Sequence, residues 1–247
     1  MSSLTANGVE HHVQELGEGG VPVVMVHGLV IGSLASWYFS AGPALAKTRL
    51  VRMYDLRGHG RSERAAAGYD TTTLASDLLE LTSDLPPFDL VGHSWGALVA
   101  LRFAIEHPDH VRRLVVVEAP LPPSSALELG AFLTADPEKI VDALPGALRA
   151  AVATGARQAK RLVANVLHLV RDTTLLADLR AEPEPRLKDL HTPTLALYGD
   201  TSSCRAGGEH LAKIAPHVEL EILHGGHYLH LDARAELTAA ILEFLDG

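Results

Sequence analysis

A serine framed by two glycines is the residue best placed to do chemistry in this chain. Ser94 lies in Gly92-His93-Ser94-Trp95-Gly96, where an apolar run over 88–91 gives way to an Ala/Leu-rich stretch over 97–104. Such a junction of strand, tight turn and helix holds a serine hydroxyl out at the top of a parallel sheet. The backbone N–H after the serine then points at whatever the oxygen attacks. The spacing therefore predicts a serine nucleophile at residue 94.

A base must accompany this serine, because a hydroxyl is a poor nucleophile until its proton is taken, and imidazole suits that task near neutral pH. The chain has 14 histidines, of which His224, His227 and His230 share one late, glycine-containing loop. These three could also be read as metal ligands, but no carboxylate or cysteine lies at a matching spacing. We therefore expect no metal there.

Composition limits the class of protein. The 247 residues are enough for one α/β domain with a sizeable core. No apolar run approaches the roughly 18 residues that a membrane span needs, and the start lacks the basic and apolar regions of a signal peptide. Cys204 is the single cysteine, so an internal disulfide is excluded, and its Ser/Gly-rich loop shows no partner ligands and predicts an inert thiol. We expect a cytoplasmic protein.

Charge argues against nucleic acid as a partner, since the net charge is −9 and a phosphate backbone demands a basic face. One local exception lies between Pro145 and Arg171, where five basic residues and no acidic one alternate with apolar residues. This pattern indicates a basic amphipathic helix. We expect a solvated face rather than a membrane or an anionic ligand as its partner, and nothing in the sequence indicates an oligomeric state.

The elements that must position Ser94 follow from an alternation of β-branched runs with helical patterns, which predicts a mostly parallel, doubly wound sheet with crossover helices. Strands are expected at 9–16 (an antiparallel edge), 21–27, 50–55, 88–92, 111–118, 194–199 and 218–223. Helices are expected at 34–46, 71–85, 95–106, 208–215 and 233–245.

The alternation breaks once. Residues 119–189 show only helical patterns separated by prolines, which is too long a stretch for a single crossover. We expect this segment to be a helical cap, inserted into a core domain formed by residues 1–118 and 190–247. The cap should lie over the carboxyl ends of the strands, where open α/β sheets bind ligands.

Four motifs together resemble those of the α/β-hydrolase family. They are the glycine-framed Ser94, His27-Gly28-Leu29 after the first buried strand, the D-x-R-G-x-G-x-S turn over 55–62, and Gly225-Gly226-His227 after the last strand. The resemblance covers nearly the whole chain outside the cap. It implies the family's fold and a serine hydrolase that needs no cofactor.

The resemblance also implies roles for individual residues. His227 occupies the family's position for the base, on a glycine-freed loop late in the chain. The backbone N–H groups of Leu29 and Trp95 should form the oxyanion hole that stabilises developing negative charge. Substrate-binding positions are expected at Gly28, Leu121 and Phe132.

The acid that orients the base is where the sequence departs from the common pattern. Most of the family carries an aspartate three residues after the glycine that ends the penultimate strand, yet position 202 holds a serine. A minority of the family places the acid at the end of the preceding strand, which here is Glu118, closing an apolar run that requires a partner for a buried carboxylate. We favour Glu118 as the acid and keep Asp200 as the alternative.

The favoured function is therefore hydrolysis of a carboxylic ester or lactone of a small, largely apolar molecule through an acyl-enzyme. Relatives of this fold also hydrolyse carbon–carbon bonds and thioesters, or act as lyases or peroxidases. A different class of alternative is a small-molecule receptor that keeps the triad and uses the cap as a switch. Fold-level analogy supports the reaction type and not the substrate.

Overall fold

A computed structural model describes residues 2–29, 32–122, 153, 157–183 and 185–247 of the chain. Its centre is an eight-stranded sheet with the order β1-β2-β4-β3-β5-β6-β7-β8. The strands are β1 (Ser2–Ala6), β2 (Val9–Leu16), β3 (Val23–Val26), β4 (Val51–Tyr54), β5 (Phe88–His93), β6 (Val111–Val117), β7 (Thr194–Gly199) and β8 (Val218–Leu223). The pairs β1–β2 and β2–β4 are antiparallel and all other neighbours are parallel. The predicted fold class is confirmed.

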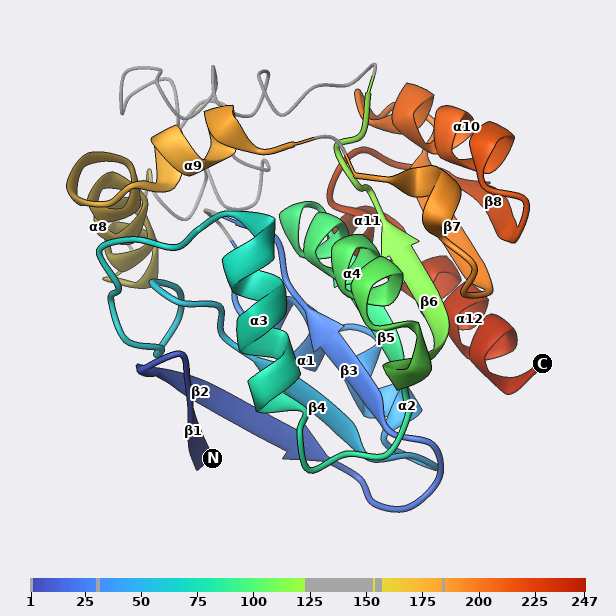
Figure 1. Ribbon diagram of the computed structural model, residues 1–247, viewed down its shortest axis with the longest axis horizontal. Coiled ribbons are helices and arrows are strands. Elements are labelled where there is room, and N and C mark those ends of the chain that lie inside the picture. Colours follow the sequence, from blue (N-terminus) through green and yellow to red (C-terminus); the bar gives the residue numbers. More distant parts are fainter. Residues whose placement is uncertain (1, 30–31, 123–152, 154–156, 184) are drawn as a thin grey trace.

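Helices cover both faces of the sheet (Figure 1). They are α1 (Ala35–Tyr38), α2 (Gly42–Leu45), α3 (Thr71–Leu81), α4 (Trp95–Glu106), α8 (Arg157–Asp172), α9 (Leu175–Ala181), α10 (Arg205–Ile214), α11 (Leu229–Asp232) and α12 (Arg234–Asp246), with short 3₁₀ turns at Pro108–His110 and Leu187–Asp189. Local signals set several ends. Asp70 caps α3 by accepting a hydrogen bond from the backbone N–H of Thr73 at 2.8 Å. Pro108 follows directly on the end of α4.

Two hydrophobic clusters hold these layers together. Because successive strand residues point to opposite faces, Val24 and Val26 of β3 join the cluster under α3, α4 and α10. Val23 and Met25 join the cluster under α1, α2 and α12. Strands buried on both faces read as continuous apolar runs, which is why the central strands were visible in the sequence.

The edge of the sheet differs from the prediction. The segment 9–16 was expected to be the edge strand, but β1 pairs with it and takes the outer position. Asn7 and Gly8 join the two strands with φ of 46° and 74°. Both angles are positive, as a type I′ hairpin turn requires, and Asn-Gly is the favoured sequence for that turn. This dipeptide was the signal for β1 that the prediction overlooked.

The segment 119–189 contributes only helices to the part that the structure describes. In Figure 1, α8 and α9 lie at the end of the molecule toward which the β6 arrow points. The backbone N–H of Tyr69 donates to Asp178 of α9 at 2.9 Å, and that of Thr71 donates to Glu182 just beyond α9 at 2.9 Å. These bonds fix α9 against the start of α3. The boundaries of a cap domain stay a prediction.

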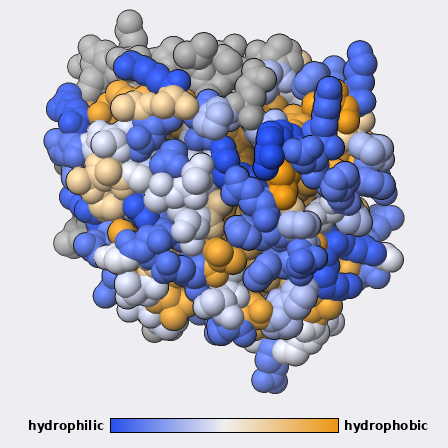
Figure 2. Space-filling model, viewed as in Figure 1, coloured by the Kyte–Doolittle hydropathy of each residue, from blue (hydrophilic) through white to orange (hydrophobic). Residues whose placement is uncertain are grey.

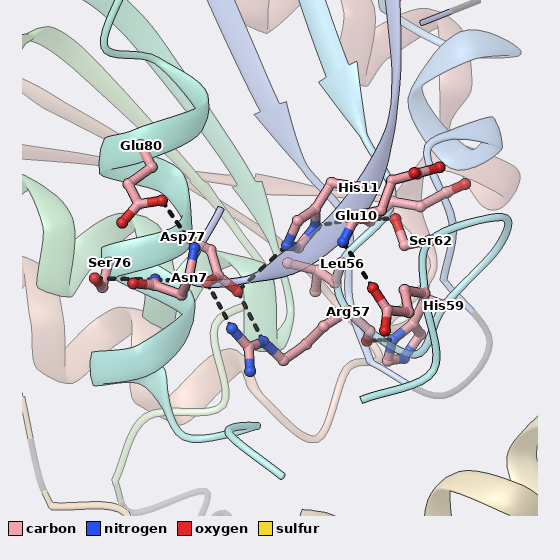
Figure 3. A network of polar contacts seen from close by, with 12 residues as sticks. Asn7, Glu10, His11, Leu56, Arg57, His59, Ser62, Ser76, Asp77 and Glu80 are labelled. Carbon is pink, nitrogen blue, oxygen red and sulfur yellow. Dashed lines mark hydrogen bonds and ion pairs between the residues drawn. The ribbon is translucent and has the colours of Figure 1, made fainter. Parts of the chain in front are cut away.

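A buried polar network anchors the turn after β4 (Figure 3). Arg57 donates to both carboxylate oxygens of Asp77 on α3, at 2.6 and 2.8 Å, and Asp77 is fully buried. His11 of β2 lies 3.6 Å from the same carboxylate. The turn motif over 55–62 therefore ties the sheet to α3.

The surface of the molecule carries little contiguous apolar area on the face shown in Figure 2, where apolar side chains are scattered among polar ones. Within the described part of the chain, no helix combines the length and the apolar character that crossing a bilayer would take.

Candidate active site

Ser94 sits at the sharp turn between β5 and α4. Its backbone has φ 55° and ψ −122°, a conformation that costs a non-glycine residue of order 1–3 kcal/mol and clusters at functional sites. The turn is held because Ser94 donates its backbone N–H to Val117 of β6 at 2.8 Å. Gly96 lets the turn approach β3, since a Cβ there would lie 2.4 Å from the carbonyl oxygen of His27. The serine hydroxyl is thereby fixed at the carboxyl end of the sheet.

His227 meets this hydroxyl from the segment between β8 and α11. Its Nε2 lies 2.9 Å from the Oγ of Ser94. The backbone carbonyl of His227 accepts a hydrogen bond of 2.9 Å from Nε2 of His93, the residue just before the serine. The loop that carries His227 is thus tied to the turn that carries Ser94.

Glu118 lies on the other side of the His227 ring. Its Oε2 is 3.1 Å from Nδ1 of His227, and the side chain is fully buried. The backbone N–H of Gly199 donates to Oε1 at 2.5 Å, and the hydroxyl of Ser202 donates to Oε2. Glu118 has φ 57°, which turns the chain at the end of β6. Three donors converge on this carboxylate and offset the penalty of burying its charge.

Asp200 is held elsewhere. Its Oδ2 lies 2.9 Å from Nδ1 of His224, and its Oδ1 accepts from the backbone N–H of Gly225 at 3.0 Å. The pKa of Asp200 is lowered by the hydrogen bond from the Gly225 backbone and then by the one from His224. The hydrogen bond with Asp200 in turn raises the pKa of His224. Of the two acids that the sequence left open, the structure therefore brings Glu118 to His227.

The surroundings of Cys204 differ from the expectation. Its loop was predicted to lack partner ligands, but the Cys204 Sγ lies 3.6 Å from Nδ1 of His227. Burial opposes a charged imidazole at this position, but hydrogen bonds to Cys204 and then to Glu118 outweigh it and raise the pKa of His227 to about 9. The prediction was wrong because residues 204 and 227 follow different strands and meet only through the pairing of β7 with β8.

The predicted oxyanion residues flank the serine. Trp95 is the first residue of α4, directly after Ser94, and its buried indole donates to the carbonyl of Tyr69 at 3.2 Å. Gly28 borders the serine on the other side, where a Cβ would lie 3.0 Å from the Cβ of Ser94. Leu29 follows it and is buried. The two backbone segments that should stabilise an oxyanion thus both adjoin Ser94.

Of the other two residues predicted to bind substrate, Leu121 and Phe132, the structure describes only Leu121. Leu121 is fully buried and lies against the backbone of Gly207 in α10, so its side chain belongs to the hydrophobic core under that helix. Phe132 lies outside the described residues. The sequence argument did not identify Ser202 as a partner of the acid. Its position three residues after Gly199, where the family's acid commonly stands, was the available signal.

The arrangement can relay a proton. A neutral His227 with its proton on Nδ1 donates to Glu118 and accepts from the Ser94 hydroxyl through Nε2, which raises the nucleophilicity of Oγ. The buried carboxylate then stabilises the imidazolium that forms when the proton moves.

Comparisons with known proteins identify the family of this fold. The model of the alpha/beta hydrolase fold family matches residues 21–170. The chain is 31% identical over 246 residues to a putative carbamate hydrolase RutD of Variovorax paradoxus, covering 92% of each protein. It is 39% identical to a soluble epoxide hydrolase of a Corynebacterium species over 116 residues, a match that spans 45% of this chain and only 39% of that enzyme.

A solved structure extends the likeness to the whole fold. Est816, described as an enzyme that degrades N-acyl homoserine lactones, superposes with a TM-score of 0.76 at 25% identity, covering 98% of this chain and 100% of that one. The chain belongs to the α/β-hydrolase family.

Proposed function

We propose that this protein is a serine hydrolase that cleaves a carboxylic ester or lactone of a small, largely apolar molecule. The observation that carries the proposal is the unbroken sequence of contacts from Ser94 Oγ to His227 Nε2, at 2.9 Å, and from His227 Nδ1 to Glu118 Oε2, at 3.1 Å. A hydroxyl, an imidazole and a buried carboxylate in this order form the constellation that activates serine in unrelated folds.

The reaction runs in two halves. Ser94 Oγ attacks the carbonyl carbon while His227 takes its proton, and the imidazolium then gives that proton to the leaving oxygen as the acyl-enzyme forms. A water molecule, deprotonated by the same His227, attacks the acyl carbon and releases the acid and Ser94. Glu118 holds the imidazole in the required tautomer and balances its charge throughout.

Backbone N–H groups of Leu29 and Trp95 are proposed to hold the oxyanion. Leu29 follows Gly28, which borders the Ser94 side chain. Trp95 follows Ser94 directly and opens α4, whose N-terminus favours negative charge. Each such donor contributes about 3 kcal/mol to stabilising the transition state. Because these donors belong to the backbone, the buried indole of Trp95 is left to the core.

The relatives bear on the class of bond. The putative carbamate hydrolase and the lactone-degrading enzyme are both named for substrates with a carbonyl carbon bonded to a heteroatom leaving group. A serine nucleophile beside two oxyanion donors suits that carbon. Because a relative that aligns over 92% of this chain is named for carbamates, an aryl carbamate belongs in the substrate panel beside esters and lactones.

The test compares hydrolysis of short-chain p-nitrophenyl esters, a γ-lactone and an aryl carbamate by the wild type and by Ser94→Ala. Loss of the nucleophile is expected to lower kcat on the order of 10⁶-fold, as in other serine hydrolases. Ser83→Ala is the matched control, since Ser83 is exposed at the end of α3. A fluorophosphonate probe should label Ser94 by peptide mass mapping. Full activity in Ser94→Ala, or a label on another residue, would end the proposal.

A further inference from the structure

The proposed hydrolysis uses both ring nitrogens of His227, Nε2 with Ser94 and Nδ1 with Glu118. A third side chain, Cys204, also lies at Nδ1. The Cys204 thiol, the Glu118 carboxylate and His227 each offer one metal-ligand atom, and these three atoms lie within 4.8 Å of one another. Nothing in the proposed reaction needs a thiol there. Sulfur, nitrogen and oxygen donors in one small cluster are the set that zinc-like ions prefer.

The thiol is built into its position. Cys204 is the N-cap of α10 and only 6% exposed, and its backbone N–H donates to the Ser202 hydroxyl at 3.1 Å. Ser202 in turn donates to Glu118, so one short loop fixes the thiol relative to the carboxylate. The N-terminus of α10 also favours a negative charge on sulfur.

The two separations from His227 Nδ1 match those around a single ion. Tetrahedral zinc bonds of about 2.3 Å to sulfur and 2.0–2.1 Å to nitrogen place the two ligand atoms about 3.6 Å apart. The observed separation of Cys204 Sγ and His227 Nδ1 is 3.6 Å. A carboxylate oxygen should lie about 3.4 Å from the nitrogen, and Glu118 Oε2 lies at 3.1 Å. The two separations from Nδ1 therefore lie within a few tenths of an ångström of those that one ion needs, and the thiol and the carboxylate oxygen lie within 4.8 Å of each other.

We propose that Glu118, Cys204 and His227 form an inhibitory site for a soft or borderline divalent cation such as Zn²⁺. The ion takes the place of the proton between Nδ1 and Oε2. The Cys204 proton leaves to solvent, and the proton displaced from Nδ1 moves to Nε2, so the imidazole stays neutral. That nitrogen then donates to Ser94 instead of accepting from it, so the base is lost while the ion is bound.

Solvent can complete the coordination. The His227 side chain is 26% exposed, whereas that of Glu118 is fully buried, so a water molecule can reach the fourth position from the imidazole side. Three protein ligands and one water-accessible position are typical of catalytic zinc sites, whereas structural sites are closed by four protein ligands. Binding is therefore expected to be reversible by a chelator.

The binding test uses Cd²⁺ with the intact protein and follows the ultraviolet thiolate-to-cadmium charge-transfer band. Because Cys204 is the single cysteine, a band in the wild type reports this thiol alone. His227→Ala should raise the apparent Kd by more than about tenfold, since even residues that only hydrogen-bond to a metal's ligands contribute that much. His224→Ala, from the exposed pair in the same loop, is the matched control and should bind as the wild type does. Circular dichroism checks that each variant is folded.

The binding test is independent of the proposed function. Ser94→Ala keeps all three ligands and should give the wild-type band, even though it is expected to be inactive. No band in the wild type, or equal Kd values for wild type and His227→Ala, would overturn the site and leave the hydrolase proposal standing.

The consequence for catalysis rests on the proposed function and has its own readout. Zn²⁺ should inhibit ester hydrolysis by the wild type, and EDTA should restore it. Cys204→Ala, measured relative to its own uninhibited rate, should need at least about tenfold more Zn²⁺ for the same inhibition. Equal sensitivity of the two proteins would show that the thiol is not an inhibitory ligand.

Discussion

Replacing Glu118 with glutamine tests the acid assignment most directly. Glu118 accepts hydrogen bonds from Gly199, Ser202 and His227, whereas a glutamine amide has a single oxygen. The backbone N–H of Gly199 cannot turn away, so the amide oxygen should stay with it and the amide NH₂ should face Nδ1 of His227. The ring must then accept at Nδ1 and carry its proton on Nε2, the tautomer that cannot take a proton from Ser94. The same wrong-tautomer effect in serine proteases lowers kcat on the order of 10⁴-fold, or about 5.5 kcal/mol.

The assay is kcat for a short-chain p-nitrophenyl ester, measured on Glu118→Gln and on Asp200→Asn. Asp200 is an exposed partner of His224, so its amide variant should stay within about twofold of the wild type, as surface changes usually do. Thermal melts monitored by circular dichroism establish that both variants are folded. The reasoning is refuted if folded Glu118→Gln retains more than about a tenth of the wild-type kcat, or if Asp200→Asn loses as much as Glu118→Gln.

Three further predictions follow from neighbouring contacts. Since a neutral His227 is needed and its pKa is raised to about 9, kcat/KM measured with EDTA present should fall as the pH drops through about 9. Cys204→Ala removes one partner that raises this pKa, so the fall in kcat/KM should occur at lower pH. A fall at the same pH in both proteins would contradict the role of the Cys204–His227 contact. Glu118→Ala/Ser202→Asp, which returns the acid to the family's common position, should hydrolyse ester at least about tenfold faster than Glu118→Ala; equal rates in two folded proteins would refute it. Arg57→Ala breaks the buried pair with Asp77 and should lower the free energy of unfolding in urea by about 3–5 kcal/mol. Arg205→Ala, which breaks an exposed pair, should lower it by less than about 1 kcal/mol. Similar losses in the two variants would contradict the stabilising role of the Arg57–Asp77 pair.

The sequence predicted the central strands and the helix after Ser94 closely, because their signals are local. The helix expected at 95–106 is α4 with those bounds, and an apolar run before it is β5. The helix expected at 34–46 is instead two short helices, α1 and α2. Pro43 lies in the first turn of α2, where proline favours a new helix start over continuation, so this break too had a local signal.

Contacts between segments distant in the sequence were harder to predict. The sequence shows that Cys204 and His227 each follow a strand, but not that β7 and β8 are neighbours in the sheet. Loop residues meet only after the strands pair, so the thiol beside the imidazole could not be predicted from spacing alone. The sequence shows that Ser202 stands where most of the family carries its acid, but its hydrogen bond to Glu118 depends on tertiary structure.

The register of β6 and β7 explains why the acid can stand in either of two places. Val117 of β6 pairs with Leu197 of β7 in parallel, so both strands end at the same edge of the sheet. Glu118 is one residue past the end of β6, and its backbone N–H donates to Leu197 at 2.9 Å. Ser202 reaches the same carboxylate from three residues past the end of β7. A carboxylate from either strand can therefore meet His227. Here β6 supplies it, and the hydroxyl at position 202 donates a hydrogen bond to it.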